Sequence, residues 1–493
     1  DEQGRIVAQG LTLPSHLGSI PEAMKSVMNH YGREMRAGDV YCLNDPFDGG
    51  MHLPDLFVFQ PIVWNGERVA MAATVCHHTD MGGRVPGSNA SDSTEIYAEG
   101  LRIPALKLYD EGRPVTSVFA FIEANVRVPK QVLGDIRAQL AACRIADQAF
   151  AQLVERYGLP VVRRYMRDLI DYGERVTRAA IRDLPDGAYD FEDWIDDDGI
   201  EYGKPIRLTV TLRKAGDTLV ADWTGSAAQV RGAINNTLSF TKAATYACIR
   251  CILPADIPNN EGFFRAIEVV APPGTIANAV LPAATAARGL TGFRMVDGCF
   301  GALAKMLPQR VPAASEGGNT GITIGGYYAD RTPFIYVDFL CSAWGGRPWA
   351  DGLDGNAHIF ANLALQSAEV CELKHPIEIL ACEFIQDVMG PGRYRGGASL
   401  RRDYRFGEDE GLLQVRSDRR ASRGTYTASA GSSQRSRADA QVISSNPIAG
   451  PFSFKGFSKV WCPPPPSVGA PVGHGVGAPP RRAAGGSFPC RGQ

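Results

Sequence analysis

Apolar residues recur at helical spacing through segment 130–157. Gly158 ends this pattern, and a second helical pattern runs over 161–182 and stops before Pro185. The sequence therefore predicts two consecutive long helices in this region. The same spacing predicts shorter helices at 238–252, 295–307 and 358–373.

Strand patterns lie between these helices. The apolar run 69–75 is typical of a buried strand. Alternating apolar residues over 206–212, a turn at 215–217 and an apolar return over 219–223 predict a hairpin. Strands and helices do not alternate regularly and no segment repeats, so the pattern favours a mixed α+β fold over a doubly wound parallel sheet.

The two ends of the chain differ from its middle. Ser, Arg, Gly and Ala crowd residues 424–440, and four consecutive prolines occupy 463–466. Segment 424–493 has too little patterned apolar surface to offset its ordering entropy, so we expect it to lack regular structure. It would then be either a disordered tail or the product of a frameshift near residue 425. At the other end, the turn sequence 1–4 leads into a strand-like segment, so we expect further residues upstream.

The composition and charge of the chain limit the kinds of partner that we expect. The chain is 44% apolar and 21% charged, as in an ordinary globular protein. Its net charge is −2 and its basic residues are dispersed, so neither nucleic acid nor a membrane surface is expected as a partner. No apolar stretch of about 18 residues could cross a membrane.

Most of the eleven cysteines are scattered through apolar segments. The close pair Cys248 and Cys251 has no second pair to complete a zinc site. We therefore expect free core thiols in a reducing compartment, the cytoplasm. There is also no phosphate-binding loop of the G-x-x-x-x-G-K-[ST] kind, so any use of ATP would depend on another chain.

A concentration of His and Asp carries the candidate chemistry. His52 and Asp55 are three residues apart, so both side chains would point the same way in one helical turn. His77 and His78 follow the strand 69–75 and face opposite sides, so only one of them can join the same site. Mixed imidazole and carboxylate ligands suit Zn²⁺, Mn²⁺ or Fe²⁺. Taken alone, the spacing also fits a hydrogen-bonded loop without metal.

Several motifs together resemble the hydantoinase B/oxoprolinase family. The resemblance covers roughly residues 1–420, in order and without large gaps. The motifs are Asn44-Asp45-Pro46, Gly49-Gly50-Met51-His52-Leu53-Pro54-Asp55, His77-His78-Thr79-Asp80-Met81-Gly82-Gly83, Glu99-Gly100-Leu101-Arg102, Asn125-Val126-Arg127, Gly134-Asp135-Ile136-Arg137, Pro258-Asn259-Asn260-Glu261-Gly262 and Arg395-Gly396-Gly397.

The resemblance implies a fold with one divalent metal ion held by His52, Asp55 and His77, together with an Asp that lies upstream of this chain. It implies an ATP-dependent hydrolase of cyclic amides, such as hydantoin, oxoproline or lactam rings. A hydantoinase A-type partner would use ATP to phosphorylate the ring amide oxygen. The metal-bound water would then open the ring.

Other residues are candidates for supporting roles. Asp80 and Glu99 are candidates for proton transfer or substrate orientation, or are structural carboxylates in tight loops. His78 would support the metal site or be solvated. Asn259 and Asn260 are candidates to bind the imide, although a Pro-Asn-Asn sequence is commonly a turn. His358 either reaches the site or packs.

These patterns divide the chain into four parts: a metal-binding domain at 1–185, a hairpin-rich segment at 186–235, a mixed α/β domain at 236–423 and the tail 424–493. Two rival functions remain open at this point. The first is a ligase subunit like that of acetone carboxylase, with the same metal and the same need for a partner. The second is an inactive, truncated gene product.

Overall fold

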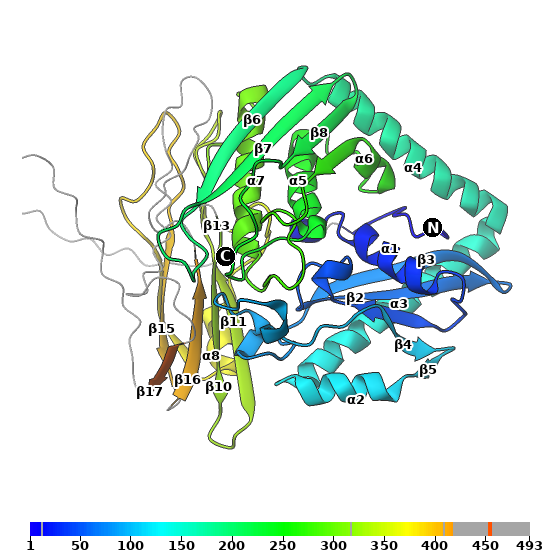
Figure 1. The fold of residues 1–493 in the computed structure, drawn as a ribbon, viewed down its shortest axis with the longest axis horizontal. Coiled ribbons are helices and arrows are strands. Elements are labelled where there is room, and N and C mark those ends of the chain that lie inside the picture. The colour runs from blue at the N-terminus through cyan, green and yellow to red at the C-terminus, as the bar shows by residue number, and fades with distance from the viewer. Residues whose placement is uncertain (11–12, 316–317, 408–409, 418–451, 456–493) are drawn as a thin grey trace, which may run out of the picture.

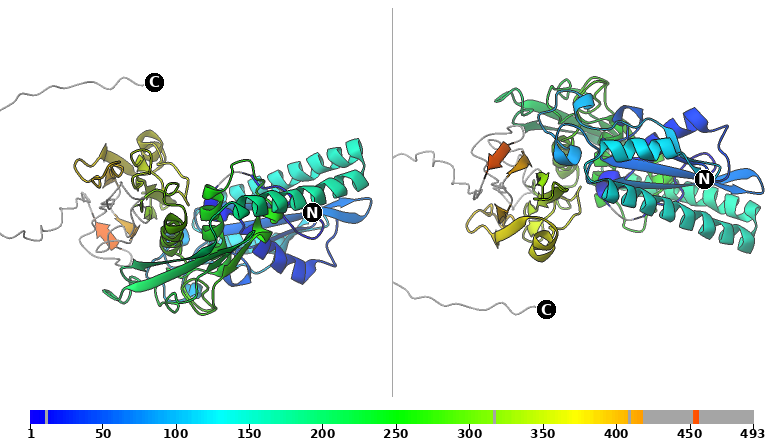
Figure 2. Two further views of the ribbon diagram at one scale, coloured as in Figure 1. Left: turned by 90° about the horizontal axis from the view of Figure 1, so that it is seen from above. Right: turned by 90° about the horizontal axis from the view of Figure 1, so that it is seen from below.

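The computed structural model describes residues 1–10, 13–315, 318–407, 410–417 and 452–455. Three main sheets, two short two-stranded ribbons and eight α-helices, of which α3 and α4 are the longest, make up this part of the chain (Figures 1 and 2). The mixture confirms the α+β class predicted from the apolar pattern. None of the helices in the described ranges is both long and apolar enough to cross a membrane.

The first sheet contains the candidate metal ligands. Its strand order is β3-β2-β1-β4-β5, and every neighbouring pair is antiparallel. The strands are β1 (Val40–Leu43), β2 (Asp55–Trp64), β3 (Glu67–His77), β4 (Leu106–Asp110) and β5 (Arg113–Pro114).

Strand β2 is buried on both faces because its side chains alternate between two cores. Phe57 and Phe59 pack into the largest apolar core, whereas Leu56 and Val58 pack into the core beneath α3 (Pro129–Tyr157). Helix α2 (Thr116–Asn125) lies against α3, and α1 (Ile20–Tyr31) lies against β2 on the side of the largest core.

The second sheet has the order β6-β7-β8-β9, with β8 and β9 parallel. Helices α5 and α7 pack together, and α7 covers β6 and β7. Helix α4 runs beside α3 and packs on α6 (Figure 2). The bounds are β6 (Gly187–Ile195), β7 (Ile206–Ala215), β8 (Thr218–Asp222), β9 (Ile267–Val270), α4 (Leu159–Arg182), α5 (Leu238–Ile252), α6 (Glu261–Arg265) and α7 (Gly289–Met306).

The third sheet has the order β11-β10-β16-β17 and lies to the left in Figure 1. Two short ribbons, β12-β13 and β14-β15, and helix α8 complete this part. The bounds are β10 (Thr320–Tyr327), β11 (Pro333–Leu340), β12 (Ser342–Ala343), β13 (Asp354–Asn356), α8 (Ala368–Lys374), β14 (Ile377–Phe384), β15 (Leu400–Phe406), β16 (Glu410–Arg416) and β17 (Phe452–Lys455).

Most of the predicted elements are confirmed. Helices α3, α4 and α5, the hairpin β7-β8 and the buried strand β3 lie where the apolar pattern placed them. Helix α7 starts at Gly289, upstream of the predicted residue 295. The helix predicted over 358–373 is wrong, because only α8 forms there. Asn362 has a left-handed backbone (φ 47°), and Ser367 caps α8 by accepting from Val370 N, so the chain cannot continue as one helix.

Two strands of the structure bear on the predicted domain boundaries. Strand β9 joins the second sheet across the proposed boundary at 235, so that sheet extends beyond the hairpin-rich segment. Strand β17 pairs with β16 and lies inside the segment 424–493, for which no regular structure was predicted. The rest of 424–493 lies outside the described residues. The four-part division and the frameshift reading stay predictions.

Candidate metal centre

The β2-β3 hairpin places the candidate ligands together. Asp55 is the first residue of β2 and lies directly opposite His77, the last residue of β3. His52 belongs to the turn before β2, in which Asp55 N donates to His52 O at 3.1 Å. His52 and Asp55 therefore lie in one turn with their side chains on the same side, as the spacing predicted.

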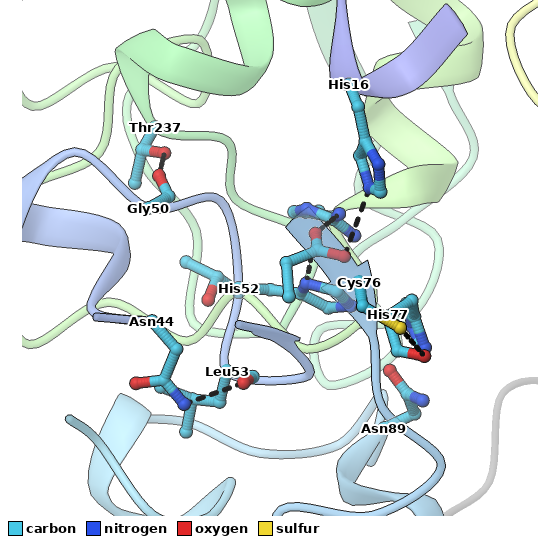
Figure 3. A network of polar contacts seen from close by, with 12 residues as sticks. His16, Asn44, Gly50, His52, Leu53, Cys76, His77, Asn89 and Thr237 are labelled. Atoms are coloured by element: carbon cyan, nitrogen blue, oxygen red, sulfur yellow. Dashed lines mark hydrogen bonds and ion pairs between the residues drawn. The ribbon is translucent and has the colours of Figure 1, made fainter. Parts of the chain in front are cut away.

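Local polar contacts hold that turn in shape. Asn44 donates from Nδ2 to Leu53 O at 2.7 Å, and its Oδ1 accepts from Ile103 N at 2.6 Å (Figure 3). Gly49 has φ 94°, and a Cβ at this position would lie 2.4 Å from Glu22 O. Only glycine fits here, because both the backbone conformation and the space exclude a side chain.

Three ligand atoms converge at the end of the hairpin. One ligand atom each from His52, Asp55 and His77 lies within 4.8 Å of the other two. His52 Nε2 is 3.1 Å from His77 Nε2, and His52 Nδ1 is 2.7 Å from Asp55 Oδ2. Figure 3 shows His52 and His77 beside one another. The metal role of these residues stays a prediction, and their geometry is compatible with it.

Two further residues hold the Asp55 carboxylate. His16, in the short 3-10 helix Pro14–His16, approaches Asp55 Oδ1 through Nε2 at 3.2 Å (Figure 3). Arg288 donates from Nη2 to Asp55 Oδ2 at 2.6 Å, and its guanidinium stacks over the Phe240 ring at 4.1 Å. Both Asp55 and Arg288 are buried. The carboxylate is therefore bound from three sides by nitrogen atoms.

Burial and these charges keep the imidazoles neutral. Burial, with the Arg288 charge adding to it, lowers the pKa of His52 to about 3. Desolvation of the imidazole among its neighbours also lowers the pKa of His77 to about 4; Asp55 opposes this shift and the Arg288 charge adds to it. For Asp55, burial opposes ionisation, but His52 and Arg288 outweigh it and hold the pKa well below its usual range. Neutral imidazoles and an ionised carboxylate are the protonation states that bind metal.

His78 lies on the other side of the strand from His77, in agreement with the predicted alternation. It is buried, and its Nε2 lies 3.1 Å from Gln139 Oε1 on α3. Gln139 in turn donates from Nε2 to Leu56 O at 2.9 Å. His78 thus joins β3 to α3, and among the described residues it makes no hydrogen bond or ion pair with His52, Asp55 or His77.

Asp80 is a loop carboxylate with several partners. It accepts from Gly87 N at 3.0 Å and from Arg127 N at 2.7 Å, and it forms an ion pair with Arg127 Nη1 at 3.1 Å. It does not line the cavity beside the metal ligands. These contacts support the structural reading of this carboxylate.

Glu99 lies behind the segment that carries Arg288. Its Oε1 accepts from Thr285 N at 2.8 Å and from Ala286 N at 2.9 Å. Burial raises the pKa of Glu99 to about 8, although these two backbone donors oppose the shift. Glu99 therefore holds the backbone of the cavity wall and touches the site only through it.

The three substrate-binding candidates lie apart from the cluster. Asn259 accepts from Arg250 Nε at 2.8 Å. Asn260 caps α6 by accepting from Gly262 N at 2.9 Å, and it donates to Leu169 O at 3.0 Å. His358 and Asn259 line a cavity of about 380 Å³ that shares Leu13 and Leu363 with the cavity beside the cluster.

The cluster opens into a cavity of about 370 Å³, a size that suits a small ring substrate. A larger, mostly apolar cavity of about 930 Å³ lies between the N-terminal segment, β3, α3 and α4, and none of the metal-ligand candidates lines it. The residues around the smaller cavity include His16, His52, Asp55, His77, Asn89, Phe240, Arg288, Phe293, Asn319, Gly321, Phe339 and Arg416.

His16, Arg288 and Arg416 were not identified from the sequence. His16 is one of only eight histidines, which is the one signal that could have singled it out. Arg288 and Arg416 come from the loop before α7 and from β16, far along the chain, and no spacing rule connects them to His52.

Comparison with known families decides the assignment. The sequence model of the hydantoinase B/oxoprolinase family matches residues 1–453. The chain belongs to the hydantoinase B/oxoprolinase family. This family member is 32% identical over 412 residues to the caprolactamase subunit beta of Pseudomonas jessenii, covering 81% of this chain and 70% of that protein.

Solved structures agree with this assignment. The crystal structure of the ATP-dependent caprolactamase from Pseudomonas jessenii has a TM-score of 0.81 at 29% identity, covering 87% of this chain and 74% of the other. Acetone carboxylase, in its nucleotide-free structure, has a TM-score of 0.78 at 19% identity over 83% of this chain and 57% of the other. At that identity, the second likeness shows the fold alone.

Proposed function

We propose that this hydantoinase B/oxoprolinase chain is the metal-binding subunit of an ATP-dependent hydrolase that opens cyclic amides. The observation that carries the proposal is the convergence of His52, Asp55 and His77 at the wall of a cavity of about 370 Å³. The similarity to a caprolactamase supports a lactam or related ring as the substrate.

The residues present fit a divalent cation. His52 Nδ1 is buried and, among the described residues, has no well-aligned hydrogen bond, although Asp55 Oδ2 is only 2.7 Å away. On the other side of the same ring, Nε2 faces His77 Nε2 at 3.1 Å. Two ligand nitrogens about 2.0–2.2 Å from one cation would be about 3.0–3.5 Å apart, so this separation suits shared coordination.

When bound, such a cation supplies a water of lowered pKa beside the substrate carbon. The protein residues prepare the site for it. His16 fixes the orientation of the Asp55 carboxylate, Arg288 keeps that carboxylate ionised when no cation is bound, and the burial of His52 keeps its imidazole unprotonated. Phe240, whose ring lies against the Arg288 guanidinium, lines the cavity as well.

ATP would enter through a second chain. An unstrained amide is a poor electrophile, and phosphorylation of its oxygen makes the ring carbon more reactive. This sequence has no recognisable phosphate-binding loop, and its similarity to a caprolactamase subunit beta supports a partner subunit. We propose a hydantoinase A-type subunit as the partner that transfers the phosphoryl group.

The test combines metal analysis with activity. The chain would be purified with and without the partner subunit, its metal measured by elemental analysis, and ATP-dependent opening of hydantoin, 5-oxoproline and caprolactam followed. We expect ring opening only in the complex. His52→Ala and His77→Ala should abolish both metal content and activity, and His30→Ala, on an exposed part of α1, should change neither.

Two outcomes would contradict the proposal. Carboxylation of acetone with bicarbonate, in place of ring opening, would indicate the ligase function. A wild-type complex that holds no metal and opens none of the three rings would support an inactive gene product.

A further inference from the structure

An arginine from the third sheet closes the metal cavity. Arg416 is the last residue of β16, and it lines the same cavity as His52 and His77. Its side chain is buried, at 5% exposure, and Nη1 donates to Asn89 O at 3.2 Å. Within the described residues, Nη2 has no hydrogen-bond partner. A strong donor is therefore left over beside the proposed reaction centre.

A second unused donor lies on the same wall. Asn319 is buried, at 2% exposure, and its Oδ1 accepts from His358 N at 2.9 Å, but its Nδ2 lacks a partner within the described part of the chain. Gly321 pairs with Arg416 in the β10-β16 ladder. Asn319 precedes Gly321 by two residues, so both lie on the same side of the extended chain.

Gly321 makes room for the guanidinium. A Cβ at this position would lie 2.7 Å from Arg416 Nη2 and 2.8 Å from its Nε. Any larger residue would therefore displace the arginine from the cavity wall. Glycine at position 321 therefore allows the Arg416 side chain to lie against the cavity wall.

Among the residues that the structure describes, no carboxylate pairs with the Arg416 guanidinium. Arg288 has Asp55 at 2.6 Å, whereas no ion pair of Arg416 occurs among the described residues. Burial lowers the pKa of Arg416 to about 10, so it remains protonated at neutral pH. The Phe339 ring, 5.8 Å away, offers only a weak cation–π contact. A buried cation without an anion is costly, and such a site favours an anionic ligand.

We propose that Arg416 and Asn319 bind the phosphoryl oxygens of an O-phosphorylated cyclic amide, so that the cavity selects the activated substrate over the free ring. This inference rests on the proposed function. A guanidinium fork matches two phosphoryl oxygens, and the Asn319 amide adds a donor. The phosphoryl group would lie against the third sheet, with the ring toward His52 and His77.

The test measures anion binding without ATP, partner or metal. The full chain would be treated with a chelator, dialysed and titrated calorimetrically with inorganic phosphate at pH 7. Loss of one hydrogen bond to a charged group weakens binding about tenfold or more, and we expect this for Arg416→Gln. Asn319→Ala should weaken phosphate binding less. Arg405→Gln is the matched control, because Arg405 is an exposed β15 residue paired with Glu378.

Stability distinguishes binding from structural support. Arg416→Gln removes a buried, unpaired charge, so its melting temperature should equal or exceed that of the wild type. Arg416→Lys keeps the charge but loses the fork, and it should bind phosphate with intermediate affinity. If Arg416→Gln does not fold, the comparison of Arg416→Lys with the wild type still decides the matter.

Three results would overturn the inference: no phosphate binding by the wild type, equal binding by Arg416→Gln, or acetate binding as tight as phosphate. Acetate distinguishes a carboxylate site from a phosphoryl site. Assays with the partner separate this inference from the proposed function. Equal ring opening by the wild type and Arg416→Gln would refute the phosphoryl subsite alone. If the wild-type complex opens no ring, the proposed function is refuted. The assignment of the ligand as a phosphorylated cyclic amide is then refuted as well.

Discussion

Arg288→Met tests whether the buried Asp55 carboxylate depends on its ion pair. Arg288 Nη2 lies 2.6 Å from Asp55 Oδ2, and both side chains are buried. Breaking a buried ion pair by removing one partner costs about 3–5 kcal/mol. Met retains much of the packing but loses the charge and the cation–π contact with Phe240. We therefore expect the metal-free variant to lose about 3–5 kcal/mol of unfolding free energy.

Metal should reduce that loss. In the wild type, the Arg288 charge repels a divalent cation that shares Asp55, and such charges a few ångströms apart repel by several kcal/mol even at an effective dielectric constant of about 20. Arg288→Met should therefore bind Zn²⁺ at least about tenfold more tightly than the wild type. Zn²⁺ at about 100 times the Kd of the variant would stabilise the variant by about 2.7 kcal/mol and the tenfold weaker wild type by about 1.4 kcal/mol, so the loss should shrink by about 1.3 kcal/mol.

The assay is urea unfolding followed by circular dichroism, with chelator and with Zn²⁺. Arg405→Met is the control, because its exposed pair with Glu378 should contribute no more than about 1 kcal/mol. The double variant Asp55→Asn/Arg288→Met should recover part of the loss, since it leaves no uncompensated charge. A loss below about 1 kcal/mol in chelator, or weaker Zn²⁺ binding by Arg288→Met, would refute the reasoning.

Three further predictions follow from buried groups. The pKa of His52 is lowered to about 3 in the folded protein, against an unfolded value of 6.5. The unfolding free energy that its neutral form contributes is therefore present above pH 6.5 and is lost as the pH falls toward 3. Metal content, measured by dialysis and elemental analysis, should fall over the same pH range. The pKa of Glu99 is raised to about 8 in the folded protein, against an unfolded value of 4.5. The unfolding free energy that its protonated form contributes is therefore present below pH 4.5 and is lost as the pH rises through 8. Glu99→Gln should therefore flatten the urea stability profile between pH 5 and 8, whereas the exposed control Glu95→Gln should not; equal slopes would contradict this. Asn260→Ala should cost about 1–2 kcal/mol through loss of the α6 cap, with an unchanged KM; a raised KM would instead favour the substrate-binding role.

The sequence predicted the local structure well where one periodicity dominated. Helix α3, the hairpin β7-β8 and the β3 strand each bury a continuous apolar face, and such faces can be read from residue spacing alone. The prediction was wrong over 358–373, because a left-handed Asn362 and the Ser367 cap override an apolar pattern that looks helical. Backbone conformation at single residues has no periodic signature.

For the candidate site, the sequence alone determined the chemistry of one hairpin. His52 and Asp55 lie three residues apart at the start of β2, and His77 ends the neighbouring strand, so short-range spacing brought these segments into one candidate site. Strand alternation allowed only one of His77 and His78 to join that site, and the family resemblance selected His77. Tertiary structure decided what surrounds them. His16, Arg288 and Arg416 reach the cavity from segments far apart in the chain. Their charges act through space, across contacts that only the packing of three sheets creates, and no sequence pattern records such contacts.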